Sequence, residues 1–193
     1  MAQESGEALK KLADELFFKH NKTIDDEQQA IAYYNQAIET KELAPVATAD
    51  CYSRSSEIYR EKKPKTSENY DNALRFILKA AEVPGLPSWY TPQGNIEKLA
   101  MCPEIYGFLP EKRNKELAWD MHNQNLMIQS GGDLAITAVN WINFLGEYDG
   151  VCDQEWINIG FDYLDKAIEN GWDDLWTSVM KCTYGRAYKY FSE

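Results

Sequence analysis

Small and bulky side chains recur along the chain at intervals close to 43 residues. An alignment that starts at Ala30 finds small residues again at Ala73, Ala118 and Gly160, at separations of 43, 45 and 42 residues. Three positions further on, each copy carries a bulky side chain: Tyr33, Phe76, Met121 and Tyr163. Residues three, seven and eight positions apart share one face of an α-helix. We therefore expect one helix per copy, with residues 30, 73, 118 and 160 wedged between helices.

A second series of positions precedes the first in every copy and keeps the same register. Its columns begin at Ala8, Cys51, Asn95, Ala138 and Met180, which are 43, 44, 43 and 42 residues apart. The residues four positions later are Leu12, Ser55, Leu99, Ile142 and Tyr184. The third copy fits least well, because Pro103 falls where the helix would continue and proline ends a helix. Each copy is thus predicted to hold two helices.

Residues typical of helix ends fall between these predicted helices. Candidate N-caps precede the second helix of three copies: Thr23, Ser67 and Asp153. Pro110 suits an early turn of the helix that follows it, and Gly171 suits the position just after a helix C-terminus. The segment 83–94 holds three prolines and two glycines, and it is predicted to be an irregular, ordered loop.

The pattern as a whole predicts an all-α fold, an α-solenoid of about four helix-turn-helix units. The expected domain is a single one over residues 1–193, with approximate repeats 4–44, 45–86, 87–131 and 132–172 and a capping helix at 173–191. One helix pair cannot bury its apolar faces alone, so successive pairs must stack on one another. Such stacks curve and present a concave groove.

Two segments resemble the tetratricopeptide superfamily, and its Sel-like branch in particular. They are "NALRFILKAAEVPG" at 72–85 and "GVCDQEWINIGFDYLDKAIENGW" at 150–172. The repeat length of about 43 exceeds the mid-thirties usual in that superfamily, and Pro103, Asn125 and Asn143 depart from its pattern. The resemblance implies a helical scaffold that binds other proteins, and it offers no catalytic residues to transfer.

Composition and charge narrow the possible partners. The formal net charge is −11, which disfavours binding to nucleic acid or to anionic lipid and is compatible with a basic protein partner or with solubility alone. No apolar run approaches the roughly 20 residues that span a bilayer. The N-terminus lacks the apolar core of a secretory signal, so we expect a cytoplasmic protein. The four cysteines form no C-x-x-C pair and are expected to be reduced and buried.

The sequence holds no recognisable catalytic motif, and we predict neither a catalytic residue nor a cofactor or metal site. Only two histidines are present. His122 shares a column with Tyr34, Ile77 and Leu164, which favours a partly buried packing role, and His20 is expected near the C-terminus of the first helix. The acidic residues Glu147, Asp149 and Asp153 leave open a remote alternative, a metal-dependent enzyme, but they lack the spacing of a calcium loop.

Aromatic residues outside the strong columns are the candidates for protein binding, because exposed aromatic side chains often anchor interfaces. They are Trp89, Tyr90, Trp141, Tyr148, Trp172 and Trp176. A structural role stays open for each of them. Tyr33 is expected in the core, and Tyr34 at an interface between repeats.

The function expected from these observations is a non-enzymatic protein–protein interaction module that holds a peptide or protein in its groove. A different hypothesis is a small acidic inhibitor, such as a bacterial toxin-immunity protein, whose charge would speed association with a basic toxin. The oligomeric state stays open.

Overall fold

The computed structural model describes residues 4–146 and 154–171, and it is entirely helical over these residues, with no strand among them. The fold class predicted from the sequence is confirmed as all-α. The elements are α1 (Gly6–Phe17), α2 (Ile24–Glu39), α3 (Pro45–Glu61), α4 (Ser67–Ala81), α5 (Pro92–Met101), the short 3-10 helices η1 (Pro103–Tyr106) and η2 (Pro110–Lys112), α6 (Lys115–Ile128), α7 (Gly131–Gly146) and α8 (Gln154–Glu169).

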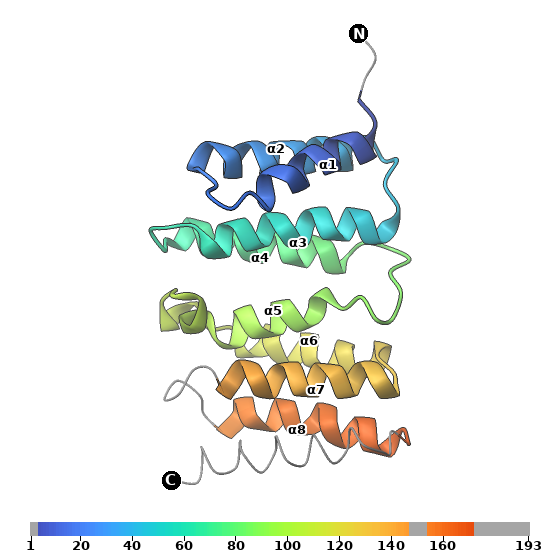
Figure 1. Cartoon of the computed structure of the whole chain (residues 1–193). Coiled ribbons are helices and arrows are strands. Elements are labelled where there is room, and N and C mark those ends of the chain that lie inside the picture. The colour runs from blue at the N-terminus through green and yellow to red at the C-terminus, as the bar shows by residue number, and fades with distance from the viewer. Residues whose placement is uncertain (1–3, 147–153, 172–193) are drawn as a thin grey trace.

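Consecutive helices pack in pairs, α1 with α2, α3 with α4, α5 with α6 and α7 with α8. The pairs follow one another in chain order from the N-terminal to the C-terminal end of the molecule (Figure 1). The odd-numbered helices α1, α3, α5 and α7 lie toward the viewer in Figure 1, so residues from different pairs share one face. No helix in the described part of the chain is long and apolar enough to cross a membrane.

The alanine columns lie in the core. Ala30, Ala73 and Ala118 are fully buried and Gly160 is buried, as the sequence pattern predicts. Small side chains at these positions let neighbouring helices approach closely. Of the bulky residues three positions on, Phe76, Met121 and Tyr163 are buried while Tyr33 is only half-buried. Its neighbour Tyr34 is fully buried.

Helix ends agree with the prediction at Thr23 and differ by one residue at Ser67. The Thr23 side chain and Asp26 form a reciprocal capping box at the start of α2. A hydrogen bond from the Thr23 backbone and then one from Lys19 lower the pKa of Asp26 to about 2. The N-cap of α4 is Thr66 instead of Ser67, because Thr66 has the extended backbone and its hydroxyl accepts the Asn69 N–H at 3.1 Å.

Prolines and glycine mark three other boundaries. The predicted loop 83–94 is too long at its C-terminal end, because Pro92 occupies the first turn of α5, where its missing N–H costs nothing. Pro110 was expected in an early turn of α6, but it begins η2, and α6 starts only at Lys115 after the N-cap Asn114. Helix α5 ends at Met101, before Pro103, as expected. Gly171 follows α8 with a φ of 75°, which confirms the predicted terminating glycine.

Candidate functional site

The face shared by α1 and α3 carries an ion-paired group of side chains centred on Asp14. The Tyr34 hydroxyl donates to Asp14 Oδ1 at 2.8 Å, and Lys10 Nζ donates to Asp14 Oδ2 at 2.8 Å. Arg54 reaches across from α3 and pairs with the same carboxylate. We call these four residues the Asp14 cluster. It ties α1, α2 and α3 together at one point.

Both burial and pairing shift the pKa values of Asp14 and Tyr34 in the Asp14 cluster. Burial alone would raise the pKa of Asp14, but hydrogen bonds from Lys10 and Tyr34 and the charge of Arg54 outweigh it, so the pKa lies below 3.8. Burial, and next the hydrogen bond to Asp14, raise the pKa of the Tyr34 hydroxyl. The carboxylate is therefore ionised and the tyrosine neutral over the physiological range.

Aromatic side chains border the Asp14 cluster on one side. The Arg54 guanidinium lies over the Phe18 ring, 4.9 Å from its centroid, and over the Phe17 ring at 5.8 Å. Phe18 is 67% exposed although it is a large apolar side chain. A cation held over an aromatic face keeps both groups in a defined position.

Tyr90 and Trp89 extend the same surface along α3. The Tyr90 hydroxyl donates to Asp50 Oδ1 at 2.8 Å and lies 3.3 Å from Ser53 Oγ. Asp50 and Arg54 are four residues apart on α3, so they share a helix face. Trp89 packs edge-to-face on Tyr90 with 5.8 Å between ring centroids, and it is 62% exposed.

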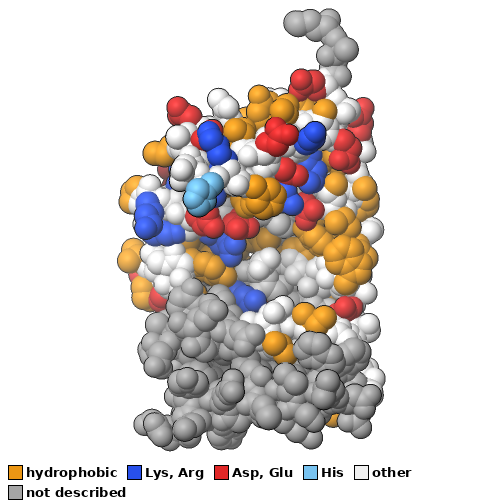
Figure 2. Space-filling view, viewed as in Figure 1, with side chains coloured by type: hydrophobic (Ala, Val, Ile, Leu, Met, Phe, Trp, Pro, Cys, Tyr) orange, Lys and Arg blue, Asp and Glu red, His pale blue; other side chains and the backbone are white. Residues whose placement is uncertain are grey.

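These contacts join residues of two helix pairs and of the loop between α4 and α5 into one surface, which we call the α1–α3 face. Its members are Lys10, Asp14, Phe18, Asp50, Arg54, Trp89 and Tyr90. Figure 2 shows hydrophobic, basic and acidic side chains interleaved over this part of the molecule.

Of the remaining aromatic candidates, the structure describes Trp141, which does not join this face. Trp141 is 1% exposed and belongs to the core formed by α5 to α8. Its side chain therefore fills the interior and offers no surface to a partner. Tyr148, Trp172 and Trp176 lie outside the described residues.

A second polar group lies between α5, α6 and α8 and is buried except for Asp162, whose side chain is 50% exposed. Tyr163 donates to Glu97 Oε2 at 2.6 Å, and Asn125 Nδ2 donates to the Tyr163 hydroxyl oxygen at 2.9 Å. His122 Nδ1 lies 3.2 Å from Glu97 Oε1, and its Nε2 lies 3.2 Å from Asp162 Oδ2. We call this group the Glu97 network, with the members Glu97, His122, Asn125, Asp162 and Tyr163.

The Glu97 network has the parts of an acid–base site without access for a substrate. Glu97 is fully buried and His122 is 1% exposed. Both ring nitrogens of His122 face carboxylates, which only accept hydrogen bonds, so only the imidazolium can donate to both. Burial and hydrogen bonding to Glu97 raise the pKa of Tyr163. The hydrogen bonds of the Glu97 network therefore suit a structural role, which is to link the α5–α6 pair to α8. Sequence reasoning placed His122 in a packing role but missed Glu97.

One signal in the sequence could have pointed to the buried network. His122 and Asn125 both stand in columns that other copies fill with Tyr34, Ile77 and Leu164 or with alanine. Two polar residues one helical turn apart on a buried face need polar partners, because an unpaired buried polar group is costly. No position in the sequence marked Glu97 as that partner.

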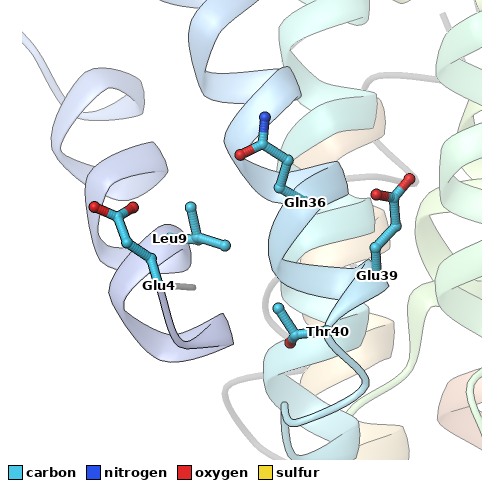
Figure 3. A pocket seen from close by; sticks show the side chains of 5 residues that line it. All are labelled: Glu4, Leu9, Gln36, Glu39 and Thr40. Atoms are coloured by element: carbon cyan, nitrogen blue, oxygen red, sulfur yellow. The ribbon is translucent and has the colours of Figure 1, made fainter. Parts of the chain in front are cut away.

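A surface hollow of about 430 Å³ lies between α1 and α2 (Figure 3). Its lining is Glu4, Leu9, Gln36, Glu39 and Thr40. Glu4, Gln36 and Glu39 are exposed, and the Thr40 hydroxyl donates to the Ala37 carbonyl at 2.7 Å. The hollow lacks a buried, unpaired polar group that would receive a ligand.

Metal ligation finds no support among the described residues, where no group of three or more His, Cys, Asp or Glu side chains could hold an ion. The acidic candidates Glu147, Asp149 and Asp153 lie outside that part of the chain. Cys51 and Cys102 are buried, and burial raises the pKa of the Cys51 thiol to about 12. His20 is exposed in the turn after α1.

Comparisons of the chain with protein-family models, with curated proteins and with solved structures find no match.

Proposed function

We propose that the chain is a helical-repeat module of the tetratricopeptide or Sel-like kind, which binds a peptide or protein on the α1–α3 face and catalyses no reaction. In this proposal the helix pairs are the units of an α-solenoid. The packing of each odd-numbered helix with its successor supports that arrangement. The burial of residues 30, 73, 118 and 160 supports it as well.

The observation that carries the proposal is the pairing of exposed aromatic side chains with neighbouring residues that are already held in place. Phe18 and Trp89 are exposed, and each lies beside a residue that is anchored by another contact, Arg54 or Tyr90. Tryptophan, tyrosine and arginine are the residue types that dominate binding energy at interfaces. Because ion pairs and hydrogen bonds fix the neighbouring charges beforehand, a partner would lose little free energy in ordering them.

The inaccessible Glu97 network favours a binding role over a catalytic one. Its histidine is the residue best suited to general-base chemistry, yet its ring is enclosed by α5, α6 and α8. Lys10 and Arg54 of the α1–α3 face are both paired with Asp14, which suits recognition better than proton transfer.

The experiment compares the double variant Phe18→Ala/Trp89→Ala with the matched control Met127→Ala/Ile136→Ala. The control also removes two exposed apolar side chains, but from α6 and α7. Each tagged protein is used for affinity purification from the native source, and recovered proteins are quantified by mass spectrometry. Both variants should keep the free energy of unfolding within about 0.5 kcal/mol of the wild type, since the lost side chains are exposed.

We expect a protein that the wild type and the control recover equally, and that the Phe18→Ala/Trp89→Ala variant recovers at about one tenth of that level or less, because anchor residues commonly contribute 2 kcal/mol or more. Equal recovery by both variants would place the binding surface elsewhere and end this proposal.

A further inference from the structure

Basic residues are concentrated in the turn between α3 and α4, although the protein as a whole carries a net charge of −11. The segment 60–65 contains four cationic residues and a single carboxylate, Glu61. We call the four cationic residues the basic turn: Arg60, Lys62, Lys63 and Lys65. The turn lies at the edge drawn on the left of Figure 1, and Figure 2 shows Lys and Arg side chains at that edge.

The cations of the basic turn have no ion-pair partner among the acidic residues that the structure describes. Nearby lysines do have such partners, because Lys22 pairs with Glu61 at 3.1 Å and Lys112 pairs with Asp71 at 2.8 Å. Within the described ranges 4–146 and 154–171, the four cations of the basic turn make no ion pair. Glu61, the carboxylate within the segment, is already paired with Lys22.

Aromatic rings form the base on which these cations lie. Lys62 lies over Tyr59 with its nitrogen 5.4 Å from the ring centroid, and Arg60 lies over Tyr106 at 4.8 Å. Lys65 lies over Phe108 at 5.1 Å. Tyr59 in turn stacks on Phe76, which is buried in the core. Three of the four cations, Arg60, Lys62 and Lys65, are therefore held against aromatic rings, while Lys63 is exposed.

The turn also combines charge with apolar surface. The stem of Lys65 lies along the backbone at Gly107, where an added Cβ would meet Lys65 Cγ at 3.5 Å. Leu109 follows Phe108 and is 61% exposed. An exposed leucine therefore stands one residue after the ring on which Lys65 lies.

The cations of the basic turn repel one another, and a bound anion would reduce this repulsion. Burial is the main cause that lowers the pKa of Lys65, Glu61 opposes it, and the positive charges of Lys63 and Arg60 lower it further. A carboxylate placed among these groups would offset that repulsion in a partly desolvated setting, where charge pairs are stronger than in water.

We propose that the basic turn is a docking site for an acidic peptide segment of a partner protein, one that carries an apolar side chain for the surface at Leu109. A short peptide fits better than a nucleic acid or a membrane. Asp25 and Glu68 are exposed in the first turns of α2 and α4, and Glu111 is exposed in η2, so an extended polyphosphate or an anionic bilayer that reached these helix starts would meet negative charge. This site is separate from the α1–α3 face and does not require that face to bind anything.

The test uses the full chain and a short fluorescein-labelled peptide in which glutamates surround one leucine, with fluorescence anisotropy as the readout. A second peptide replaces every glutamate with glutamine. The variant Lys62→Gln/Lys63→Gln/Lys65→Gln is compared with the control Lys11→Gln/Lys41→Gln/Lys79→Gln, whose three lysines are exposed elsewhere. Both variants lower the net charge by the same amount, so any difference between them reports position and not total charge. Circular dichroism checks that both stay helical.

We expect the glutamate peptide to bind at low salt and the glutamine peptide not to bind. The basic-turn variant should weaken the affinity about tenfold, and the control by less than about twofold, given the usual energies of surface charge pairs. The Phe18→Ala/Trp89→Ala variant should bind the peptide as the wild type does, which separates this site from the proposed function.

Three results would overturn the docking site as stated. The first is an unchanged anisotropy with the glutamate peptide, and the second is an equal loss of affinity in both lysine variants. The third is tighter binding of single-stranded RNA or phosphatidylserine vesicles than of the peptide, lost in the basic-turn variant, which would assign the turn to a different class of partner.

Discussion

The Asp14 cluster and the Glu97 network both contain a hydrogen bond from a tyrosine to a carboxylate, but the first lies near the surface and the second in the interior. In each, a carboxylate on an odd-numbered helix accepts a hydrogen bond from the hydroxyl of a buried tyrosine on an even-numbered helix. The distance is 2.8 Å from Tyr34 to Asp14 and 2.6 Å from Tyr163 to Glu97. The side chain of Asp14 is 23% exposed, whereas that of Glu97 is fully buried. Water can replace a lost partner at Asp14 but not at Glu97. The outer cluster can therefore serve recognition, while the inner network fixes how α5, α6 and α8 fit together.

The largest expected effect comes from Glu97→Ala. Removing this carboxylate takes one of two partners from the buried His122 and the acceptor from the Tyr163 hydroxyl, and we expect a loss of about 3–5 kcal/mol in the free energy of unfolding. Asp14→Ala is the matched variant in the outer cluster. It should cost about 1–2 kcal/mol, because Lys10 and Arg54 can be solvated while the Tyr34 hydroxyl loses its acceptor. Urea denaturation followed by circular dichroism measures both losses, and a larger loss for Asp14→Ala would contradict the comparison.

A smaller effect separates the two tyrosines. Tyr163→Phe removes a hydroxyl that donates to Glu97 and accepts from Asn125, so two buried groups lose a partner and we expect a loss of about 2–3 kcal/mol. Tyr34→Phe removes one donor to Asp14 while Lys10 and Arg54 remain paired with it, so the loss should be about 1 kcal/mol. The same urea titrations apply to both variants. Equal losses would mean that the depth of the two clusters does not set their contribution.

The features of this molecule that can be predicted from the sequence are local ones, whereas the burial of a given side chain cannot be predicted in the same way. The helices, the buried alanine columns, the cap at Thr23 and the glycine after α8 follow from side-chain size, periodicity and backbone preference. These are local properties, so they can be read along the sequence. Trp89 and Trp141 could not be told apart in that way, because whether a tryptophan is exposed depends on which helices meet around it.

Neither the Asp14 cluster nor the Glu97 network could be predicted from the sequence, and the reason is the same for both. Arg54 and Asp14 are 40 residues apart, and Tyr163 and Glu97 are 66 residues apart. Sequence periodicity shows which residues share a helix face, but not which charges from different helices meet. In the sequence, the residues next to Glu97 and to Asp14 are those expected around an ordinary exposed carboxylate on an amphipathic helix. Only the packing of the helices gives one of them a histidine and the other an arginine.

The smallest expected effect is the pH dependence of the Asp14 cluster. The folded-state pKa of Asp14 lies below its ordinary value of 3.8, so the ionised carboxylate stabilises the fold at pH values above 3.8. That contribution is lost as the pH falls through the folded-state pKa, because the proton must then bind to the paired carboxylate. The cluster is partly exposed, so we expect the contribution to be at most about 1 kcal/mol.

The measurement is the difference in the free energy of unfolding between the wild type and Asp14→Asn over a series of pH values. Asparagine keeps an acceptor for Tyr34 but has no charge to titrate. The difference should be largest near neutral pH, should decrease below pH 3.8, and should decrease with added salt at neutral pH because water reaches the cluster. A difference that is independent of both pH and salt would mean that the charge of Asp14 does not stabilise the fold. The outer cluster would then differ from the inner one in chemistry as well as in depth.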